Sequence, residues 1–312
     1  MSTAKFVPPT ADDDNRGVRE AIAQTSVAGL LRDSFIRFRY ADGFSFARSM
    51  AFQVVLALIP GVIFVVALAV RIGEGRLQSM LREAVTTLAP GPAGQTLIIA
   101  FEQGSNAGRA NVIAMVLGGG AALVSAIAAM AQLQRGASRI YGVLGDRKTF
   151  HRYGLATLLT LTTGLLLSGA FLLIVFGSSM GVVQDGLLET WAWARWPLGT
   201  IALVLGLAGL FKKAPNRRQA EFRWLTLGGS IAALAWLAVS VGLSIFLNAS
   251  TTFGQTYGPL AGFIGVMIWA FLSSIAVFYG LAVAAQLEAI RAGFSSPVDD
   301  RTPDERAAER VA

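Results

Sequence analysis

The stretch PLAGFIGVMIWAFLSSIAVFYGLAVAA, from Pro259 to Ala285, decides the fold because it is long, apolar and free of charged residues. A helix needs about 20 mainly apolar residues to cross the hydrocarbon core of a bilayer. In lipid, every backbone N–H and C=O must find its partner within the chain, and a helix provides this within one segment. The stretch therefore predicts a transmembrane helix.

Five further apolar stretches qualify, or nearly qualify, in the same way. They are Ala51–Val70, Asn111–Leu133, Gly154–Phe176, Pro197–Phe211 and Leu225–Leu247. The stretch Pro197–Phe211 is the shortest, and it reaches full length only if the tryptophan-rich segment before it extends the helix. The predicted fold is all-α, a polytopic integral membrane helical bundle with six transmembrane helices.

The composition supports lipid as the solvent of this chain and excludes several kinds of chemistry. Of its 312 residues, 54% are hydrophobic and 14% are charged, whereas a soluble domain carries about 25% charged residues. There is no cysteine and one histidine, His151. Disulfides, thiolate metal sites, cysteine nucleophiles and histidine metal clusters are thereby excluded. We expect no metal site and no cofactor.

The basic residues alternate between the predicted loops in a way that sets the topology. The N-terminal segment, the loops after the second and fourth spans, and the C-terminal tail together hold 21 of the 26 lysines and arginines. Basic loops stay in the cytoplasm, so both termini are predicted to be cytoplasmic. The net charge of +7 then lies on that side, where topology and anionic lipids account for it. We therefore expect membrane lipids as partners and no nucleic acid.

Amphipathic segments and polar ends complete the predicted organisation. Between Ser26 and Arg39 apolar residues recur at helical spacing, which indicates a helix lying in the membrane interface. A second such segment, Arg76–Leu88, lies in the long loop after the first span. We predict a disordered tail at 1–20, a six-helix membrane domain at 21–291 and a second disordered tail at 292–312.

Four segments, in order, resemble the YihY/BrkB family of bacterial inner-membrane proteins. They are SFARSMAFQVVLALIPGVIFVVALAV (Ser45–Val70), AQLQRGASRIYGV (Ala131–Val143), LFKKAPNRR (Leu210–Arg218) and TYGPLAGFIGVMIWAFLSSIAVFYG (Thr256–Gly280). The resemblance implies a multi-pass protein of the bacterial inner membrane, with six helices and a poorly defined function. Some members of that family carry a virulence or serum-resistance label, and others an old ribonuclease label.

The chain departs from this family near the end of the last span. Where many members read Gly-Ala-Glu-Leu-Asn, this chain has Gly280 to Ala284 with Ala282 at the acidic position. Gln286 and Glu288 come next, close to the predicted cytoplasmic boundary. A mechanism that needs a carboxylate at the acidic position of that motif is therefore not expected here.

Uncharged residues at membrane depth are the candidates for a cavity or gate. Gln53 offers a polar group and Pro60 a kink in the first span, and a second group of candidates surrounds the start of the last span. The second group is Gly254, Tyr257, Gly258, Pro259 and Gly262. The alternative for all of them is ordinary helix packing, which small residues permit.

Basic residues between the fourth and fifth spans are candidates for contact with lipid phosphates. They are Lys212, Lys213, Arg217 and Arg218. Such clusters bind anionic headgroups, and the alternative is that they only anchor the topology.

The leading hypothesis is a transporter or translocator of an uncharged or lipid-like substrate, passive or dependent on a partner. Its basis is a bundle without intramembrane charge and without a phosphate-binding GxxxxGK loop. The alternative is a scaffold or envelope-integrity factor that holds a second copy or another protein against its glycine faces. We expect no enzyme activity, because nuclease chemistry requires converging carboxylates or imidazoles.

Overall fold

The structure, a computed structural model, describes most of the predicted membrane domain and short parts of both tails. The described residues are 3–8, 26–72, 98–99, 102, 112–143, 145–164, 166, 188–219, 222–249, 260–294 and 296–299. The helices and strands are α2 (Val27–Tyr40), α3 (Gly43–Ile72), α6 (Val112–Ile140), α7 (Thr149–Leu159), η1 (Thr160–Gly164), α9 (Leu188–Lys213), α10 (Phe222–Ala249), α12 (Leu260–Arg291), β1 (Thr3–Ala4) and β2 (Val298–Asp299). The all-α prediction is confirmed apart from these two short strands.

Four described helices are long and apolar enough to cross a membrane. Their apolar segments are Gly43–Phe64, Met115–Ile140, Trp224–Leu247 and Leu260–Arg291. They coincide with the first, second, fifth and sixth predicted spans. The third predicted span begins in α7 and η1 and continues outside the described residues. The fourth lies in α9, a helix of 26 residues that takes in the tryptophan-rich segment, so the total of six spans stays a prediction.

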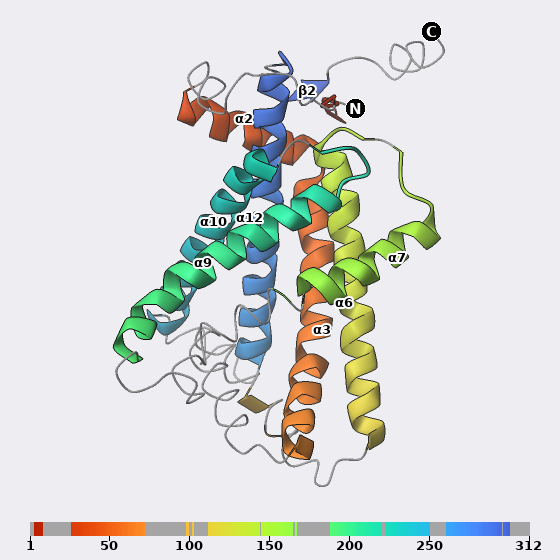
Figure 1. Ribbon diagram of the computed structural model, residues 1–312, viewed down its shortest axis with the longest axis vertical. Helices are drawn as coiled ribbons and strands as arrows, with labels where there is room; N and C mark the ends of the chain where they lie inside the picture. The colour runs from red at the N-terminus through yellow and green to blue at the C-terminus, as the bar shows by residue number, and fades with distance from the viewer. Residues whose placement is uncertain are drawn as a thin grey trace.

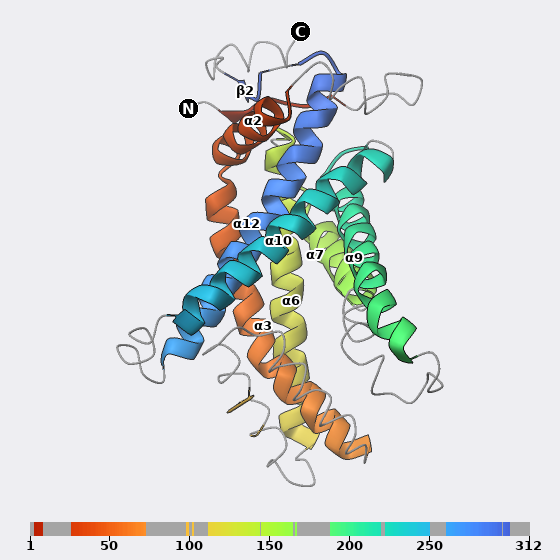
Figure 2. The ribbon, with the colours of Figure 1, turned by 90° about the vertical axis from the view of Figure 1, so that its left-hand side faces the viewer.

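The long helices pack in two pairs around α12 (Figures 1 and 2). α3 lies along α6, α9 contacts α10, and α12 contacts α3 and crosses α10. At the α10–α12 crossing, a Cβ added to Gly280 would lie 2.5 Å from the carbonyl oxygen of Gly228. The two backbones therefore touch, as small residues in membrane helices allow.

Pro60 and the glycines of the second span meet where α3 packs on α6. Pro60 lies inside α3, and a Cβ added to Gly118 would lie 3.5 Å from the Pro60 carbonyl oxygen. A Cβ at Gly119 would lie 2.8 Å from the ring of Phe64. Two adjacent glycines of α6 therefore allow α3 to pack closely against it.

The amphipathic segment before the first span forms α2, as predicted. The Ser26 hydroxyl caps it by accepting a hydrogen bond from the Gly29 N–H at 3.0 Å, a usual helix start. Asp42 then adopts a left-handed φ of 57°, and the chain turns into α3. At this turn Gly43 leaves no room for a side chain, since a Cβ would lie 2.3 Å from the Phe38 ring. The other amphipathic segment, 76–88, lies outside the described residues.

Parts of the two tails meet at one end of the bundle. β1 pairs with β2 in antiparallel fashion, with Thr3 opposite Asp299 and Ala4 opposite Val298. Val7 is fully buried, and its N–H donates to the Tyr141 carbonyl oxygen at 3.1 Å. Backbone pairing and one buried side chain therefore join residues 3–8 and 296–299 to the bundle, and disorder of the tails over 1–20 and 292–312 stays a prediction. We call the end of the bundle that carries β1 and β2 the tail end.

Candidate functional site

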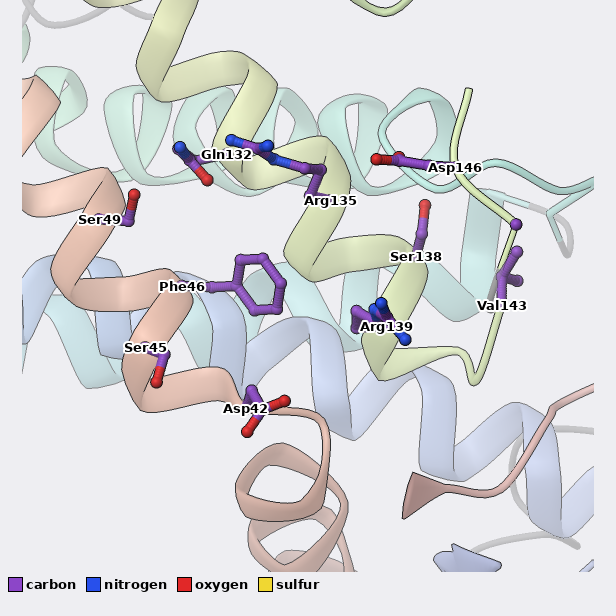
Figure 3. Close-up of a pocket in the computed structure, with 11 residues that line it drawn as sticks. Asp42, Ser45, Phe46, Ser49, Gln132, Arg135, Ser138, Arg139, Val143 and Asp146 are labelled. Carbon is purple, nitrogen blue, oxygen red and sulfur yellow. The ribbon is translucent and has the colours of Figure 1, made fainter. Parts of the chain in front are cut away.

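A pocket of about 700 Å³ opens at the tail end between the start of α3 and the end of α6 (Figure 3). The turn before α3, α3 itself, α6 and the segment after α6 supply its lining residues. They are Asp42, Ser45, Phe46, Ser49, Gln132, Arg135, Ser138, Arg139, Val143, Gly145 and Asp146. We call it the tail-end pocket. Its volume lies within the range of small-molecule sites, and most of its lining is polar.

Two arginines from one face of α6 supply the positive charge of the tail-end pocket. Arg135 and Arg139 are four residues apart, which in a helix places their Cβ atoms about 6 Å from each other. Neither guanidinium makes a hydrogen bond or an ion pair with a described residue. The Nε of Arg135 is buried without any partner among those residues. Buried donors normally have a hydrogen-bond partner, so a group outside the described residues is expected to satisfy this one.

The two carboxylates of the pocket differ in their partners. Asp146 accepts a hydrogen bond from Nη1 of Arg152 at 2.8 Å, so its charge is paired. The Asp42 carboxylate makes no ion pair with a described residue and lies at the start of α3 (Figure 3). Among the described residues, the pocket therefore presents two cations and one anion without protein partners, with hydroxyls and an amide between them.

A second polar region, the inner cluster, lies buried beside the pocket at the tail end. It consists of Arg37, Tyr141, Arg217, Gln286 and Glu288. Arg37 donates from Nε to Oε1 of Gln286 at 2.8 Å and from Nη1 to the carbonyl oxygens of Lys5 at 2.8 Å and Ile140 at 3.2 Å. The cluster thus joins α2, α6, α12 and the N-terminal segment.

Arg217 binds the other half of the inner cluster. Its Nη2 pairs with Oε1 of Glu288, and its Nη1 donates to the Val7 carbonyl oxygen. The guanidinium carbon also lies 4.5 Å from the centre of the Tyr141 ring, within the range of a cation–π contact. The side chains of Arg217 and Glu288 are 4% and 1% exposed, so this pair is shielded from water.

Burial shifts the pKa values of Arg37 and Tyr141 in the inner cluster. Desolvation lowers the pKa of Arg37 to about 10, so its guanidinium stays protonated. Desolvation, and after it the charge of Glu288, raises the pKa of Tyr141. The buried Tyr141 hydroxyl is therefore neutral.

Arg147 fastens the loop after α6 to the loop after α9. It donates to the carbonyl oxygens of Ala214 at 2.8 Å and Pro215 at 2.7 Å, and to Oε1 of Gln134 at 3.3 Å. Ser138 accepts from the Asn216 N–H at 3.1 Å on the same side. This arginine is occupied by the protein, so it adds no free charge to the neighbouring pocket.

The structure places only some of the predicted cavity and gate residues. Gln53 is half-buried in α3, four residues beyond the pocket residue Ser49. Pro60 lies deeper in α3 against α6. Gly262 is buried in α12, whereas Gly254, Tyr257, Gly258 and Pro259 lie outside the described residues. Gln53 and Pro60 are thus on one helix, and the pocket ends one turn before the first of them.

The four predicted headgroup contacts divide between the surface and the interior. Lys212, Lys213 and Arg218 are exposed at the tail end. Arg217 points inward to Glu288, so its guanidinium belongs to the inner cluster and faces protein instead of lipid. The contact with headgroups stays a prediction for the three exposed residues.

Sequence reasoning locates neither the tail-end pocket nor the inner cluster. It assigns Arg135 and Arg139 to topology, although their spacing of four residues on one helix face is a usable signal. It places Gln286 and Glu288 close to the cytoplasmic boundary but gives no sign that they are buried in the protein, where they are 0% and 1% exposed. Within the described residues, no group of three or more His, Asp or Glu residues comes together to hold a metal ion.

Comparison with known proteins relates the chain to membrane proteins. The family described as virulence factor BrkB matches residues 34–304. The ribonuclease-like protein YfkH of Bacillus subtilis is 26% identical over 264 residues, which cover 82% of this chain and 94% of the relative. No solved structure matches the chain.

Further relatives are named only as UPF0761 membrane proteins. Those of Delftia acidovorans and Nitrosospira multiformis are 28% and 25% identical over 79% and 82% of this chain. The chain spans 59% and 60% of their length. These relatives therefore share the membrane region and extend beyond it.

Proposed function

Because this chain belongs to the virulence factor BrkB family, we propose that it is a non-enzymatic membrane protein that binds and translocates a lipid-like molecule of no net charge. One observation carries the proposal: the tail-end pocket holds charged groups without partners among the described residues and lies at one end of two helices able to cross the membrane. Such a position gives a polar headgroup a site while its apolar part stays in lipid.

The tail end is cytoplasmic in this proposal, and the membrane is the bacterial inner membrane. The described parts of the basic N-terminal segment, of the loops after α6 and α9, and of the C-terminal tail lie at this end (Figure 1). Lysine- and arginine-rich segments remain on the cytoplasmic side. The pairing of β1 with β2 brings the two tails together, which supports an even number of spans.

A polar stripe on α3 suggests how a headgroup leaves the pocket toward the membrane interior. Ser45 and Ser49 line the pocket, and Gln53 comes next at the same spacing of four residues. Residues four apart lie on one helix face. On α6 the pocket residue Gln132 and the half-buried Ser125 are seven residues apart, which also places them on one face. Hydroxyl and amide groups thus continue inward without a charge.

Absence of net charge in the substrate is inferred from the composition of the spans. The apolar stretches from Ala51 to Val70 and from Pro259 to Ala285 carry no charged residue. An isolated charge at the bilayer centre costs at least about 2.5 kcal/mol, and nothing in these stretches would offset that cost. Because the sequence has no nucleotide-binding loop, the movement is passive or driven by a partner.

Translocation is tested with the purified protein in liposomes that contain a fluorescent phosphatidylethanolamine. We expect the protein to move the labelled lipid between leaflets faster than empty liposomes do, and Gln53→Leu to slow this movement. Ser230→Ala is the matched control, since the Ser230 hydroxyl donates only to the Thr226 carbonyl oxygen of its own helix, α10. Folded protein that moves none of a panel of labelled lipids would contradict the proposal.

The scaffold alternative gains no support from the described residues. It relies on glycine faces at the start of the last span, and Gly262, which belongs to that face, is buried within the chain. The glycines of α10 and α12 are likewise used inside the molecule, at Gly228 and Gly280. We therefore retain the translocation proposal alone.

A further inference from the structure

The arginines of the tail-end pocket have the geometry of an anion site. Arg135 and Arg139 project from successive turns of α6 into one pocket (Figure 3). Neither has a partner among the described residues, and the Nε of Arg135 is buried. A guanidinium presents its donors as a planar fork that matches the oxygens of a phosphate or carboxylate. Two such forks, carried by residues whose Cβ atoms lie about 6 Å apart on the helix, suit a phosphate group held between them.

The charges near Arg135 and Arg139 indicate which second group the bound phosphate ester carries. Asp146 is paired with Arg152, and Arg147 is used by backbone carbonyls. The lining carboxylate that has no ion pair with a described residue is Asp42. It is fixed at the turn before α3 and lies on the Arg139 side of the pocket, away from Gln132 (Figure 3). A ligand with an anion in its middle and a cation or hydroxyl at one end complements this arrangement.

We infer that the tail-end pocket binds a phosphate ester that carries an amine or hydroxyl group. Arg135 and Arg139 hold the phosphate, and Asp42 holds the amine or hydroxyl. The headgroup of a zwitterionic phospholipid and a small soluble phosphate such as phosphoethanolamine share this chemistry. The site deepens the proposed function by naming the headgroup, and it rests on that function only for the movement of the lipid after binding.

The depth of the pocket favours the lipid as the source of this group. The apolar segment of α3 begins at Gly43, one residue after Asp42, and that of α6 ends at Ile140, one residue after Arg139. The lining thus lies where the spans leave the hydrocarbon, which is the depth of lipid headgroups.

Binding of three probes to the detergent-purified full chain separates the sources. The probes are dihexanoyl-phosphatidylethanolamine, phosphoethanolamine and dihexanoyl-phosphatidylglycerol, each titrated by calorimetry against the wild type and variants. Stronger binding of the first probe than of the second identifies a lipid headgroup, and equal binding of the two identifies a soluble phosphate. Absence of saturable binding by both overturns the inference.

Substitutions locate the site and test the role of each charge. Arg139→Gln is expected to weaken dihexanoyl-phosphatidylethanolamine binding by roughly tenfold or more, the loss of one charge-assisted pair. Arg135→Gln has the same expected effect. If Arg135→Gln fails to fold, Arg139→Gln still provides the test, because Arg139 is exposed and makes no bond with a described residue. Arg32→Gln is the control, because Arg32 is exposed on α2 at the same end and does not line the pocket. Equal affinity in all variants contradicts the assignment.

Asp42→Asn should change the binding affinity in a direction that depends on the probe. It removes the partner of the amine, so binding of dihexanoyl-phosphatidylethanolamine falls. It also removes a negative charge near the phosphate, while the asparagine oxygen still accepts a hydrogen bond from a hydroxyl, so binding of dihexanoyl-phosphatidylglycerol holds or rises. A fall for both probes would contradict the role of Asp42.

The binding and translocation results remain distinguishable. Arginine-dependent binding without any lipid movement in liposomes leaves the site standing and ends the proposed function. Lipid movement that persists in Arg139→Gln and Arg135→Gln, with no measurable binding in the wild type, ends the site and leaves the function.

Discussion

The inner cluster and the tail-end pocket lie side by side at one end of the bundle, and both are built on arginines. In the inner cluster, Arg37 and Arg217 bind side chains and backbone carbonyls from three parts of the chain, the N-terminal segment, α6 and α12. In the pocket, Arg135 and Arg139 bind no described residue. The difference separates charges that hold the fold from charges that are free to hold a ligand.

The contrast also explains why a hydrophobic bundle keeps buried charges at all. A buried ion pair is weak as a source of stability, but removal of one partner is costly because the other charge is stranded. Glu288 and Arg217 therefore fix the relative positions of α12, the loop after α9 and the N-terminal segment. That fixed framework holds the end of α6, from which the pocket arginines project.

The largest expected effect comes from breaking the ion pair of the inner cluster. Arg217→Met leaves Glu288 buried without this partner, which should destabilise the protein by about 3–5 kcal/mol. Unfolding in detergent, followed by circular dichroism, measures the change. Arg218→Met is the matched control, since the neighbouring Arg218 is exposed. Equal stability of the two variants would place Arg217 among the surface charges.

Removal of the N-terminal segment should have the next largest effect. Deletion of residues 1–8 takes away the carbonyl oxygens that accept from Arg37 and Arg217, and hydrogen bonds to charged groups contribute about 1.5–3 kcal/mol each. We expect a loss of about 3 kcal/mol in the same unfolding assay. Phe6→Ala keeps the backbone and trims an exposed ring, so it should be close to wild type. A truncated protein as stable as the wild type would exclude residues 3–8 from the framework.

A substitution at the apolar crossing of α10 and α12 should cost less stability than breaking the inner cluster and more than changing the tail-end pocket. Gly280→Ala places a methyl group 2.5 Å from Cβ of Ala232 and from the Gly228 carbonyl oxygen. Overpacking of this kind costs about 1–3 kcal/mol. Gly242→Ala, on α10 with nothing within 4 Å, should instead be neutral or slightly stabilising. Thermal unfolding of the two variants compares them, and a stable Gly280→Ala would mean that the helices do not touch there.

The smallest expected effect is that of the pocket arginines on stability without ligand. Arg139→Gln removes an exposed side chain that makes no bond with a described residue, and such surface changes usually stay within about 0.5 kcal/mol. The unfolding midpoint without added ligand should match that of the wild type. A loss of stability comparable to that of Arg217→Met would show that the pocket arginines stabilise the fold as the inner cluster does.

The long helices could be predicted because their signal is local. Absence of charge from Pro259 to Ala285 marks α12, and the apolar spacing after Ser26 marks α2, whatever surrounds them. Two-residue strands carry no such signal. Their pairing joins Thr3 to Asp299, at opposite ends of the sequence, so this contact between the two tails could not be expected from composition.

The polar site escaped prediction because a sequence gives the type of a residue and not its partners. Arg37 lies on the buried side of α2 only because Gln286 and two carbonyl oxygens accept its hydrogen bonds. Arg217 and Arg218 are equivalent by sequence, yet one is buried and one exposed. The spacing of Arg135 and Arg139 is visible in the sequence, whereas the absence of a partner for either one among the described residues required the structure.

Ligand-dependent thermal stability tests the central distinction most directly. The unfolding midpoints of wild type and Arg139→Gln are measured with and without dihexanoyl-phosphatidylethanolamine, since a ligand that binds only the folded state raises the midpoint. The account predicts equal midpoints without ligand and a ligand-induced rise in the wild type that Arg139→Gln loses or greatly reduces. A variant that is already unstable without ligand, or that keeps the full rise, would contradict it.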